Sequence, residues 1–151
     1  MKDKILILSK FIFLFFITSN LCADELKINS TEVKIDKKSS NIIFQGNIKA
    51  IDENKNILEA DKAIYTKSRD VLTSIGPTKI ITSNNYLFES KDVIFDNENK
   101  IIKSNFPTKI IDPEGNTILV NMFNYNSIKN ILFSKGKIEL SDKNKNIYKF
   151  S

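Results

Sequence analysis

The chain has 151 residues, of which 23 are basic and 18 acidic, and it contains no histidine and a single cysteine. Without histidine, the usual nucleophile and base pairs cannot be built, and most transition-metal sites lose their common ligands. We therefore expect no catalytic residues, no cofactor, no metal and no enzyme activity. The basic excess is mild and spread along the chain, so it does not predict nucleic-acid binding.

The first 23 residues have the pattern of a secretory signal peptide. Lys2 and Lys4 precede or flank an apolar run, residues 5–17, that holds no acidic residue, and Ala23 is a small residue at the predicted cut. A permanent membrane anchor needs roughly 20 apolar residues, more than this run supplies. We predict cleavage after Ala23, which leaves a domain of residues 24–151. That domain has no cysteine and must fold without disulfides.

A period of thirty residues organises the rest of the chain. Residues 58–82 align without a gap on residues 88–112, so that Leu58 matches Phe88 and the segment Pro77–Ile81 matches Pro107–Ile111. The same step lands on residues 28–52 in one direction and 118–142 in the other. Such units bury their apolar faces by stacking on one another. The sequence thus predicts four 30-residue units, and a function carried by an extended surface or groove.

Within each unit, apolar and small residues alternate with polar ones. From Leu72 to Ile80 every second residue is apolar or small, a period that is typical of a strand with one inward face. A glycine recurs midway through these strands, at Gly46, Gly76 and Gly136, which predicts a bulge or bend there. Phe106 replaces this glycine in the third unit, so we expect the third unit to differ at that point.

The first half of each unit is a shorter strand, and turns join the two halves. In the second unit the phase slips near Asp61, which predicts a kink or bulge. The aromatic residues Tyr65, Phe95 and Tyr125, with Ile35 in the first unit, are predicted to form one ladder along the stack. Turn residues cluster at 67–70, 97–100 and 127–130 and at 52–56, 83–85, 112–116 and 142–146. We therefore predict an all-β protein with two strands per unit and about eight principal strands, and more than eight if the kinks split them.

Both ends of the stack are predicted to be open. Tyr148 and Phe150 occupy the unit positions of Leu58 and Ala60, so a fifth unit begins before the sequence stops. An open sheet edge invites pairing with another chain. We predict partner edge strands around Leu26 and Ile28 at the start and Tyr148 and Phe150 at the end. The other interpretation is that the sequence is a fragment of a longer protein.

These motifs resemble a known periplasmic family. The segment Leu58–Tyr65 with Gly76–Ile80, and Gly46–Ala50 before them, is similar to the OstA-like domain of the lipopolysaccharide-transport bridge protein LptA and of the N-terminus of LptD. The resemblance implies a twisted, open β-jelly-roll, folded like a taco, in which lipopolysaccharide acyl chains slide along an apolar interior. It also implies a place in the periplasm, associated with the outer membrane. The implied partners are lipopolysaccharide, other Lpt jelly-rolls joined by strand addition, and the outer-membrane assembly machinery.

An apolar lining is what such a lipid needs, because each exposed CH2 group costs about 0.8 kcal/mol in water. By the resemblance, inward side chains of both halves of the units would line the groove. These are Phe44, Ile48, Tyr65, Ile80, Phe95, Ile110, Tyr125, Ile138 and Leu140. Lysines near the rim would meet lipid phosphates, but the sequence does not indicate which.

Several alternatives stay open at this point. The unfinished fifth unit favours an LptD-type N-terminal domain, whereas the short length favours an LptA-type bridge. A secreted β-repeat scaffold or adhesin with a closed core and no lipid would show the same alternation. A carbohydrate-processing enzyme would need paired carboxylates; Asp112 and Asp142 recur at one unit position, but they lie in predicted turns.

Overall fold

The computed structural model describes residues 26–37 and 39–150, and the predicted signal peptide lies outside them. The described residues form fifteen strands in one antiparallel sheet, with one short 3-10 helix. In chain order the elements are β1 (Lys27–Asn29), β2 (Glu32–Asp36), β3 (Asn41–Ile51), β4 (Ile57–Thr66), η1 (Lys67–Arg69), β5 (Val71–Ser74), β6 (Pro77–Ile81), β7 (Leu87–Lys91), β8 (Ile94–Asp96), β9 (Ile101–Ser104), β10 (Thr108–Ile111), β11 (Thr117–Val120), β12 (Phe123–Asn126), β13 (Ile131–Phe133), β14 (Ile138–Ser141) and β15 (Ile147–Phe150). The strands outnumber the eight predicted because most predicted strands divide in two.

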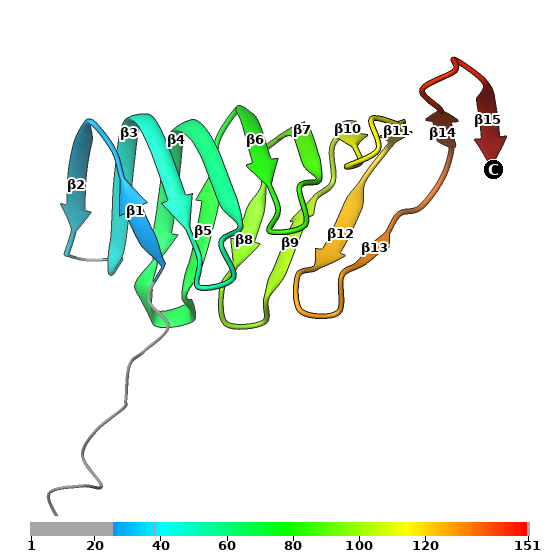
Figure 1. Cartoon of the computed structure of the whole chain (residues 1–151). Coiled ribbons are helices and arrows are strands. Elements are labelled where there is room, and N and C mark those ends of the chain that lie inside the picture. Colours follow the sequence, from blue (N-terminus) through cyan, green and yellow to red (C-terminus); the bar gives the residue numbers. More distant parts are fainter. Residues whose placement is uncertain (1–25, 38, 151) are drawn as a thin grey trace, which may run out of the picture.

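The sheet folds into two arms that share the long strands β3 and β4. Arm A contains β2, the first half of β3, the second half of β4, and then β5, β8, β9, β12 and β13. Arm B contains β1, the second half of β3, the first half of β4, and then β6, β7, β10, β11, β14 and β15. The chain passes between the arms along one side, here called the spine, and the opposite side is the mouth. In Figure 1 the turn between β14 and β15 lies far from the turn between β12 and β13.

The bend at the spine begins with a bulge in β3. The register between β3 and β4 shifts between Gln45 and Ile48, opposite Asp61, which confirms the irregularity predicted there. Gly46 has a φ of +75°, and a Cβ at this position would lie 3.0 Å from Thr31. A side chain would be both strained and crowded, so glycine is required. Gly76 and Gly136 also have positive φ, whereas Phe106 does not, so the third unit differs as predicted.

Serine hydroxyl groups form hydrogen bonds with backbone groups at the spine, where the strand pairing is interrupted. Ser74 Oγ accepts a hydrogen bond from the Val93 backbone N–H at 2.8 Å. Ser104 Oγ donates to the Lys91 carbonyl at 2.7 Å, and Ser134 Oγ donates to the Met122 carbonyl at the same distance. These three serines are thirty residues apart. Buried backbone groups need partners, so the repeat supplies one hydroxyl at each crossing.

The inner face of each arm carries one continuous row of apolar side chains. In arm A, Tyr65, Phe95 and Tyr125 lie in the same cross-strand row, with aliphatic residues between them and Ile35 at the start. This confirms the predicted ladder. In arm B the corresponding row runs through Ile28, Ala50, Leu58, Ile80, Phe88, Ile110, Ile118, Leu140 and Tyr148. The two rows face each other across the interior.

The arm B turns are built on an aspartate that binds its own loop. Asp52 accepts hydrogen bonds from both the backbone N–H and the side-chain amide of Asn56 at 2.8 Å. Asp112 and Asp142 repeat this geometry in their own turns, which confirms the turn role. The hydrogen bond from the Asn146 side chain is the main reason that the pKa of Asp142 lies below its usual value.

Successive arm B turns are also linked to one another. The Asn56 side-chain oxygen accepts a hydrogen bond from the Ser83 backbone N–H at 3.1 Å, and the Asn116 oxygen accepts one from Lys143 at 3.3 Å. The equivalent hydrogen bond between the turns at residues 82–86 and 112–116 cannot form. Tyr86 replaces the asparagine that would accept it, and Pro113 replaces the residue that would donate it. Proline has no backbone N–H, so both the donor and the acceptor are missing.

Candidate functional site

The interior between the arms holds the residues predicted to line a groove. Phe44, Ile48, Ile80, Phe95, Ile110 and Tyr125 all belong to one buried apolar cluster. Tyr65, Ile138 and Leu140 point to the same interior and are half-buried. The strand phase predicted from the sequence is therefore that of the structure, while contact of these residues with lipid stays a prediction.

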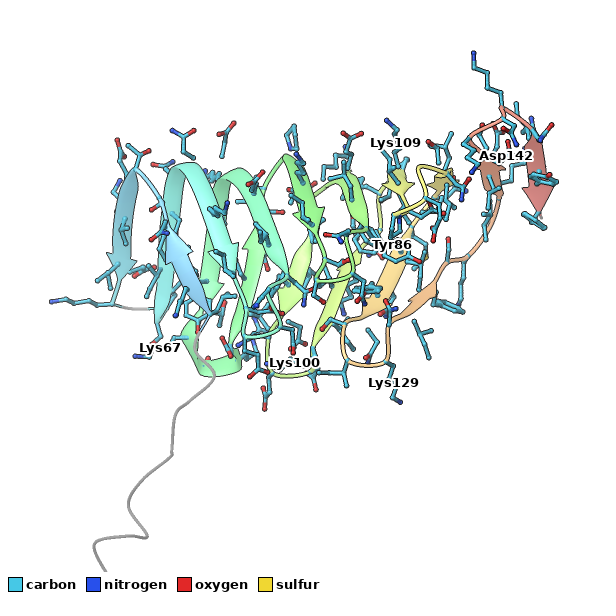
Figure 2. All side chains as sticks on the ribbon, in the orientation of Figure 1. Lys67, Tyr86, Lys100, Lys109, Lys129 and Asp142 are labelled. Atoms are coloured by element: carbon cyan, nitrogen blue, oxygen red, sulfur yellow. The ribbon has the colours of Figure 1, made fainter. Side chains whose placement is uncertain are left out.

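An aromatic cluster fills the middle of the interior. The ring of Phe88 in arm B lies 4.9 Å from that of Phe123 and 5.6 Å from that of Tyr125, both in arm A. Tyr86 packs against the same core and lies between the two edges of the molecule in Figure 2. Tilted ring pairs at this spacing are favourable beyond the area they bury. Here the two arms are in direct contact.

Polar contacts close the mouth above this cluster. Lys100, in the arm A turn after β8, forms an ion pair with Glu53, in the arm B turn after β3, with 2.5 Å between Nζ and Oε1. The Tyr125 hydroxyl group donates a hydrogen bond to Asn130 at 2.8 Å. Burial raises the pKa of Tyr125 above its usual value of 10.0, and hydrogen bonds with Asn84 and Thr82 of arm B oppose this. Side chains of the two rims thus meet across the mouth.

The two ends of the interior are uncovered, each on a different arm. At the start of arm A, Val33 and Ile35 of β2 are 58% and 69% exposed. At the end of arm B, Tyr148 and Phe150 of β15 are 48% and 57% exposed. All four belong to the inner face, because they pair with inward residues of β3 and β14. The arms are therefore offset along the stack.

The partner-edge residues predicted from the sequence behave differently at the two ends. Leu26 is buried and Ile28 packs against the core, in and beside β1, whereas Tyr148 and Phe150 are exposed. Sequence reasoning placed Val33 and Ile35 in the repeat but did not predict that they would be uncovered. The alternating pattern of residues 32–36 predicts that Val33 and Ile35 point inward, but the same pattern occurs in covered and uncovered strands. It does not indicate whether the opposite arm covers these side chains.

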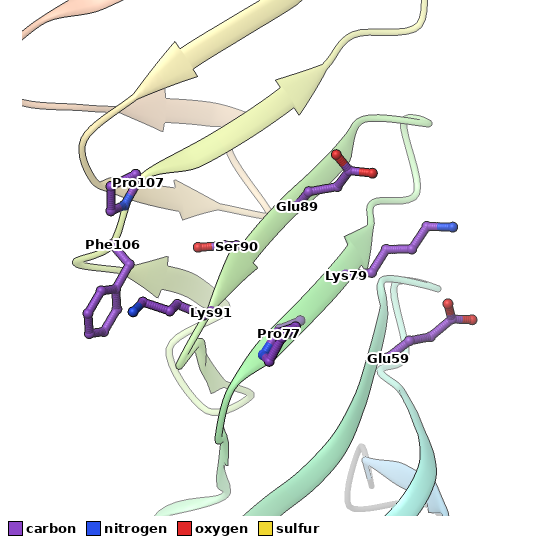
Figure 3. Close-up of a pocket in the computed structure, with 9 residues that line it drawn as sticks. Glu59, Pro77, Lys79, Glu89, Ser90, Lys91, Phe106 and Pro107 are labelled. Atoms are coloured by element: carbon purple, nitrogen blue, oxygen red, sulfur yellow. The ribbon is translucent and has the colours of Figure 1, made fainter.

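A shallow hollow of about 690 Å³ lies on the outer face of arm B, beside the spine. Figure 3 shows Pro77, Phe106 and Pro107 on its walls, and the Lys91 ammonium group lies 4.3 Å from the centroid of the Phe106 ring. The carboxylates of Glu59 and Glu89 at its border are ion-paired with lysines of neighbouring strands. Asp112 and Asp142 do not line it. The two aspartates considered for a carbohydrate-processing enzyme are therefore not brought together in this hollow.

Two other features bear on the kind of site. Within residues 26–37 and 39–150, no group of three or more histidine, cysteine, aspartate or glutamate side chains could hold a metal ion. The same residues include no helix that is long and apolar enough to span a membrane.

Taken together, the described residues form an open antiparallel β-jelly-roll with an apolar interior between two arms. No family model matches the sequence, and no curated protein matches it. Thirteen chains of solved structures match the fold. One of them is the crystal structure of LptH, the LptA homologous periplasmic component of the conserved lipopolysaccharide transport device from Pseudomonas aeruginosa.

The match to LptH covers 85% of this chain and 95% of that chain, with a TM-score of 0.65 and 12% sequence identity. At this identity the likeness shows the fold alone. The predicted all-β, taco-like jelly-roll is confirmed: this chain has the fold of an LptA-type lipopolysaccharide-transport protein.

Proposed function

We propose that the chain carries lipopolysaccharide through the periplasm, with the acyl chains in the apolar interior. The observation that carries this proposal is the pair of inward apolar rows that continue into uncovered ends of both arms. A lipid acyl chain is stabilised by about 0.8 kcal/mol per CH2 group that it removes from water. Among the predicted lining residues, Ile138 and Leu140 are half-buried where the arms part, so they offer accessible apolar lining there. No catalytic group is needed for this role.

We further propose that neighbouring jelly-rolls join end to end. The uncovered inner face of arm B, with Tyr148 and Phe150, is matched by an uncovered inner face of arm A, with Val33 and Ile35. A second jelly-roll placed beyond β15 would lay its own β2 over this face and continue the interior. Strand β15 pairs on one side only within the described residues, and its free edge suits strand addition. The partners in this role are other Lpt-type jelly-rolls.

The location that fits this role is the periplasm, in association with the outer membrane and its assembly machinery. The predicted signal peptide of residues 1–23 supports export. An LptD-type domain and a free-standing LptA-type bridge would both use the interior in the same way. Expression of the full chain in a Gram-negative host, followed by fractionation and mass measurement, tests export and cleavage after Ala23.

Photocrosslinking to lipopolysaccharide tests lipid carriage. A photoreactive residue is placed in turn at Ile110, Ile138 and Leu140, and at the outward Lys79 as the control. We expect adducts from the inward positions, strongest at Ile138 and Leu140, and none from Lys79. An absence of adducts from all inward positions contradicts lipid carriage. Adducts from Lys79 alone contradict the interior as the binding site.

A scaffold or adhesin with a closed core is the second candidate function. It is favoured by the aromatic contact of Phe88 with Phe123 and Tyr125, which fills the middle of the interior. In this role the uncovered ends would join copies of the protein, and the interior would hold no lipid. The same crosslinking experiment separates the two functions, because a scaffold forms end-to-end assemblies without any lipid adduct.

A further inference from the structure

The two rims of the mouth carry opposite charge. The arm A turns at residues 67–70, 97–100 and 127–130 have a net charge of +2, with four cations against two carboxylates. The arm B turns at residues 52–56, 82–86 and 112–116 have a net charge of −3, with one lysine against four carboxylates. Lys67, Lys100 and Lys129 follow one edge of the molecule in Figure 2. The rims therefore attract each other where they come close.

One ion pair joins these rims directly. The Lys100 and Glu53 side chains are only 17% and 30% exposed, and their charged atoms are 2.5 Å apart. By contrast, the pairs Lys49–Glu59, Lys109–Glu89 and Lys149–Glu139 each join neighbouring strands of arm B on its outer face. A partly buried pair is screened less by salt than an exposed one. The Lys100–Glu53 pair is thus placed to hold the arms together.

A lipid that enters the middle of the interior from the mouth side passes between the two turns that this pair joins. When these turns part, Lys100 stays at the lip of an apolar interior, where its ammonium group donates a hydrogen bond to Asn97 at 3.3 Å. An ammonium group has three donors, and a phosphate offers several charged acceptor oxygens. A lipid with an anionic head therefore brings a replacement partner for Lys100, whereas a lipid with a neutral head does not.

We propose that the Lys100–Glu53 pair is a latch that an anionic lipid head group opens, by replacing the Glu53 carboxylate as the partner of Lys100. This inference rests on the proposed function. It adds that the lipid head group is anionic and that Lys100 recognises it. A ligand shifts an equilibrium only by its preference for one state. Here that preference comes from a contact with Lys100 that exists only when the mouth is open.

The test measures the width of the mouth between two spin labels. Ser83→Cys in the arm B rim and Glu98→Cys in the arm A rim are exposed positions, and Cys22→Ser removes the only native cysteine. The labelled full chain is measured alone, with dodecyl phosphate, with dodecyl maltoside and with inorganic phosphate. We expect a longer distance with dodecyl phosphate, and no change with the neutral lipid or with phosphate alone.

Variants assign the effect to the ion pair. We expect Glu53→Gln and Lys100→Gln to widen the mouth without lipid, and Lys100→Gln to bind dodecyl phosphate about tenfold more weakly. The matched control is Lys109→Gln, which makes the same charge change in a pair on the outer face and should leave the distance unchanged.

The outcomes separate the latch from the proposed function. If lipopolysaccharide crosslinks to the interior but Glu53→Gln leaves the mouth unchanged, the latch is wrong and lipid carriage stands. Equal opening by dodecyl maltoside, or by inorganic phosphate, overturns recognition of an anionic lipid head. If Glu53→Gln widens the mouth but no lipid binds to any variant, head-group opening and lipid carriage both fail.

Discussion

The middle of the molecule and its C-terminal end are built from the same unit but differ in how they are covered. Phe88 and Tyr148 occupy the same unit position and the same inner row of arm B. Phe88 is 1% exposed, whereas Tyr148 is 48% exposed. The difference lies in the facing arm: Phe88 has Phe123 and Tyr125 opposite it. The difference in burial between these two equivalent residues is therefore set by the offset of the arms.

Sheet twist explains the offset. Adjacent strands rotate relative to one another by about 20 to 25° in a fixed sense, so two arms that leave the spine together diverge as strands are added. Two contacts join an earlier part of arm B to a later part of arm A. Strand β7 contacts β12, and the turn at residues 52–56 contacts the turn at residues 97–100. The last strands of arm B consequently extend beyond arm A.

The largest effect is expected from a truncation in the covered region. Phe88→Ala removes a buried ring that contacts two others, and we expect it to lower the free energy of unfolding by about 3 to 5 kcal/mol. Tyr148→Ala changes the same unit position at the uncovered end and should cost less than about 1 kcal/mol. Urea unfolding of both variants measures the difference. Equal costs would show that the end is as well packed as the middle.

A smaller effect is expected at the bulge that bends β3. Gly46→Ala combines a positive φ with a Cβ that would lie 3.0 Å from Thr31, so we expect a loss of about 2 to 3 kcal/mol. Gly115→Ala has a similar φ but no atom within 4 Å, and should cost about 1 to 2 kcal/mol. Thermal unfolding of the two variants compares them. A larger loss at Gly115 would mean that crowding at the spine is unimportant.

The uncovered end should affect association more than stability. Tyr148→Asp puts a charge on the inner face of β15, where a neighbouring jelly-roll is proposed to pack. We expect association to weaken at least about tenfold, or 1.4 kcal/mol, with unfolding almost unchanged. Sedimentation at several protein concentrations measures this, and Lys149→Asp, on the opposite face of the same strand, is the control. A similar loss in both variants would point to the strand edge alone.

The smallest effect is expected at high pH, at the mouth. Because burial raises the pKa of Tyr125, the unfolded chain loses this proton at a lower pH than the folded chain does. This group therefore lowers stability as the pH rises above 10.0, the usual value, toward the higher folded value. Tyr125→Phe should lose less stability than the parent chain between pH 9 and pH 11. Parallel slopes in urea unfolding would mean that Tyr125 is hydrated in the fold.

The local parts of this fold were predictable from the sequence. The strand phase of Phe95 and Ile110, the bulge near Asp61 and the turn role of Asp142 all follow from neighbours within a few residues. A bend midway through the longer strands was also predicted, from the recurring glycine. The groups that satisfy the backbone at the spine were not, because the serine hydroxyl groups there bond to backbone atoms 12 to 19 residues away.

The candidate site was predictable only in part. The inward direction of its side chains follows from the period of two, but whether the opposite arm buries them does not. The pairing of Glu53 with Lys100 joins turns of different units, and it depends on the twist accumulated over several strands. The exposure of Val33 and Ile35 has the same origin. Such features require the arrangement of both arms, which no local pattern contains.

The hydrogen bond that is missing between the turns of Tyr86 and Pro113 also constrains how this sequence can evolve. Replacing Tyr86 with asparagine alone adds an acceptor that has no donor, and replacing Pro113 with serine alone adds a donor that has no acceptor. Only the double replacement can form the bond that Asn56 and Asn116 make elsewhere. A double-mutant cycle should therefore show that the double replacement is more stable than the two single replacements predict when added. Each of these positions, 27 residues apart, thus limits which changes are favourable at the other.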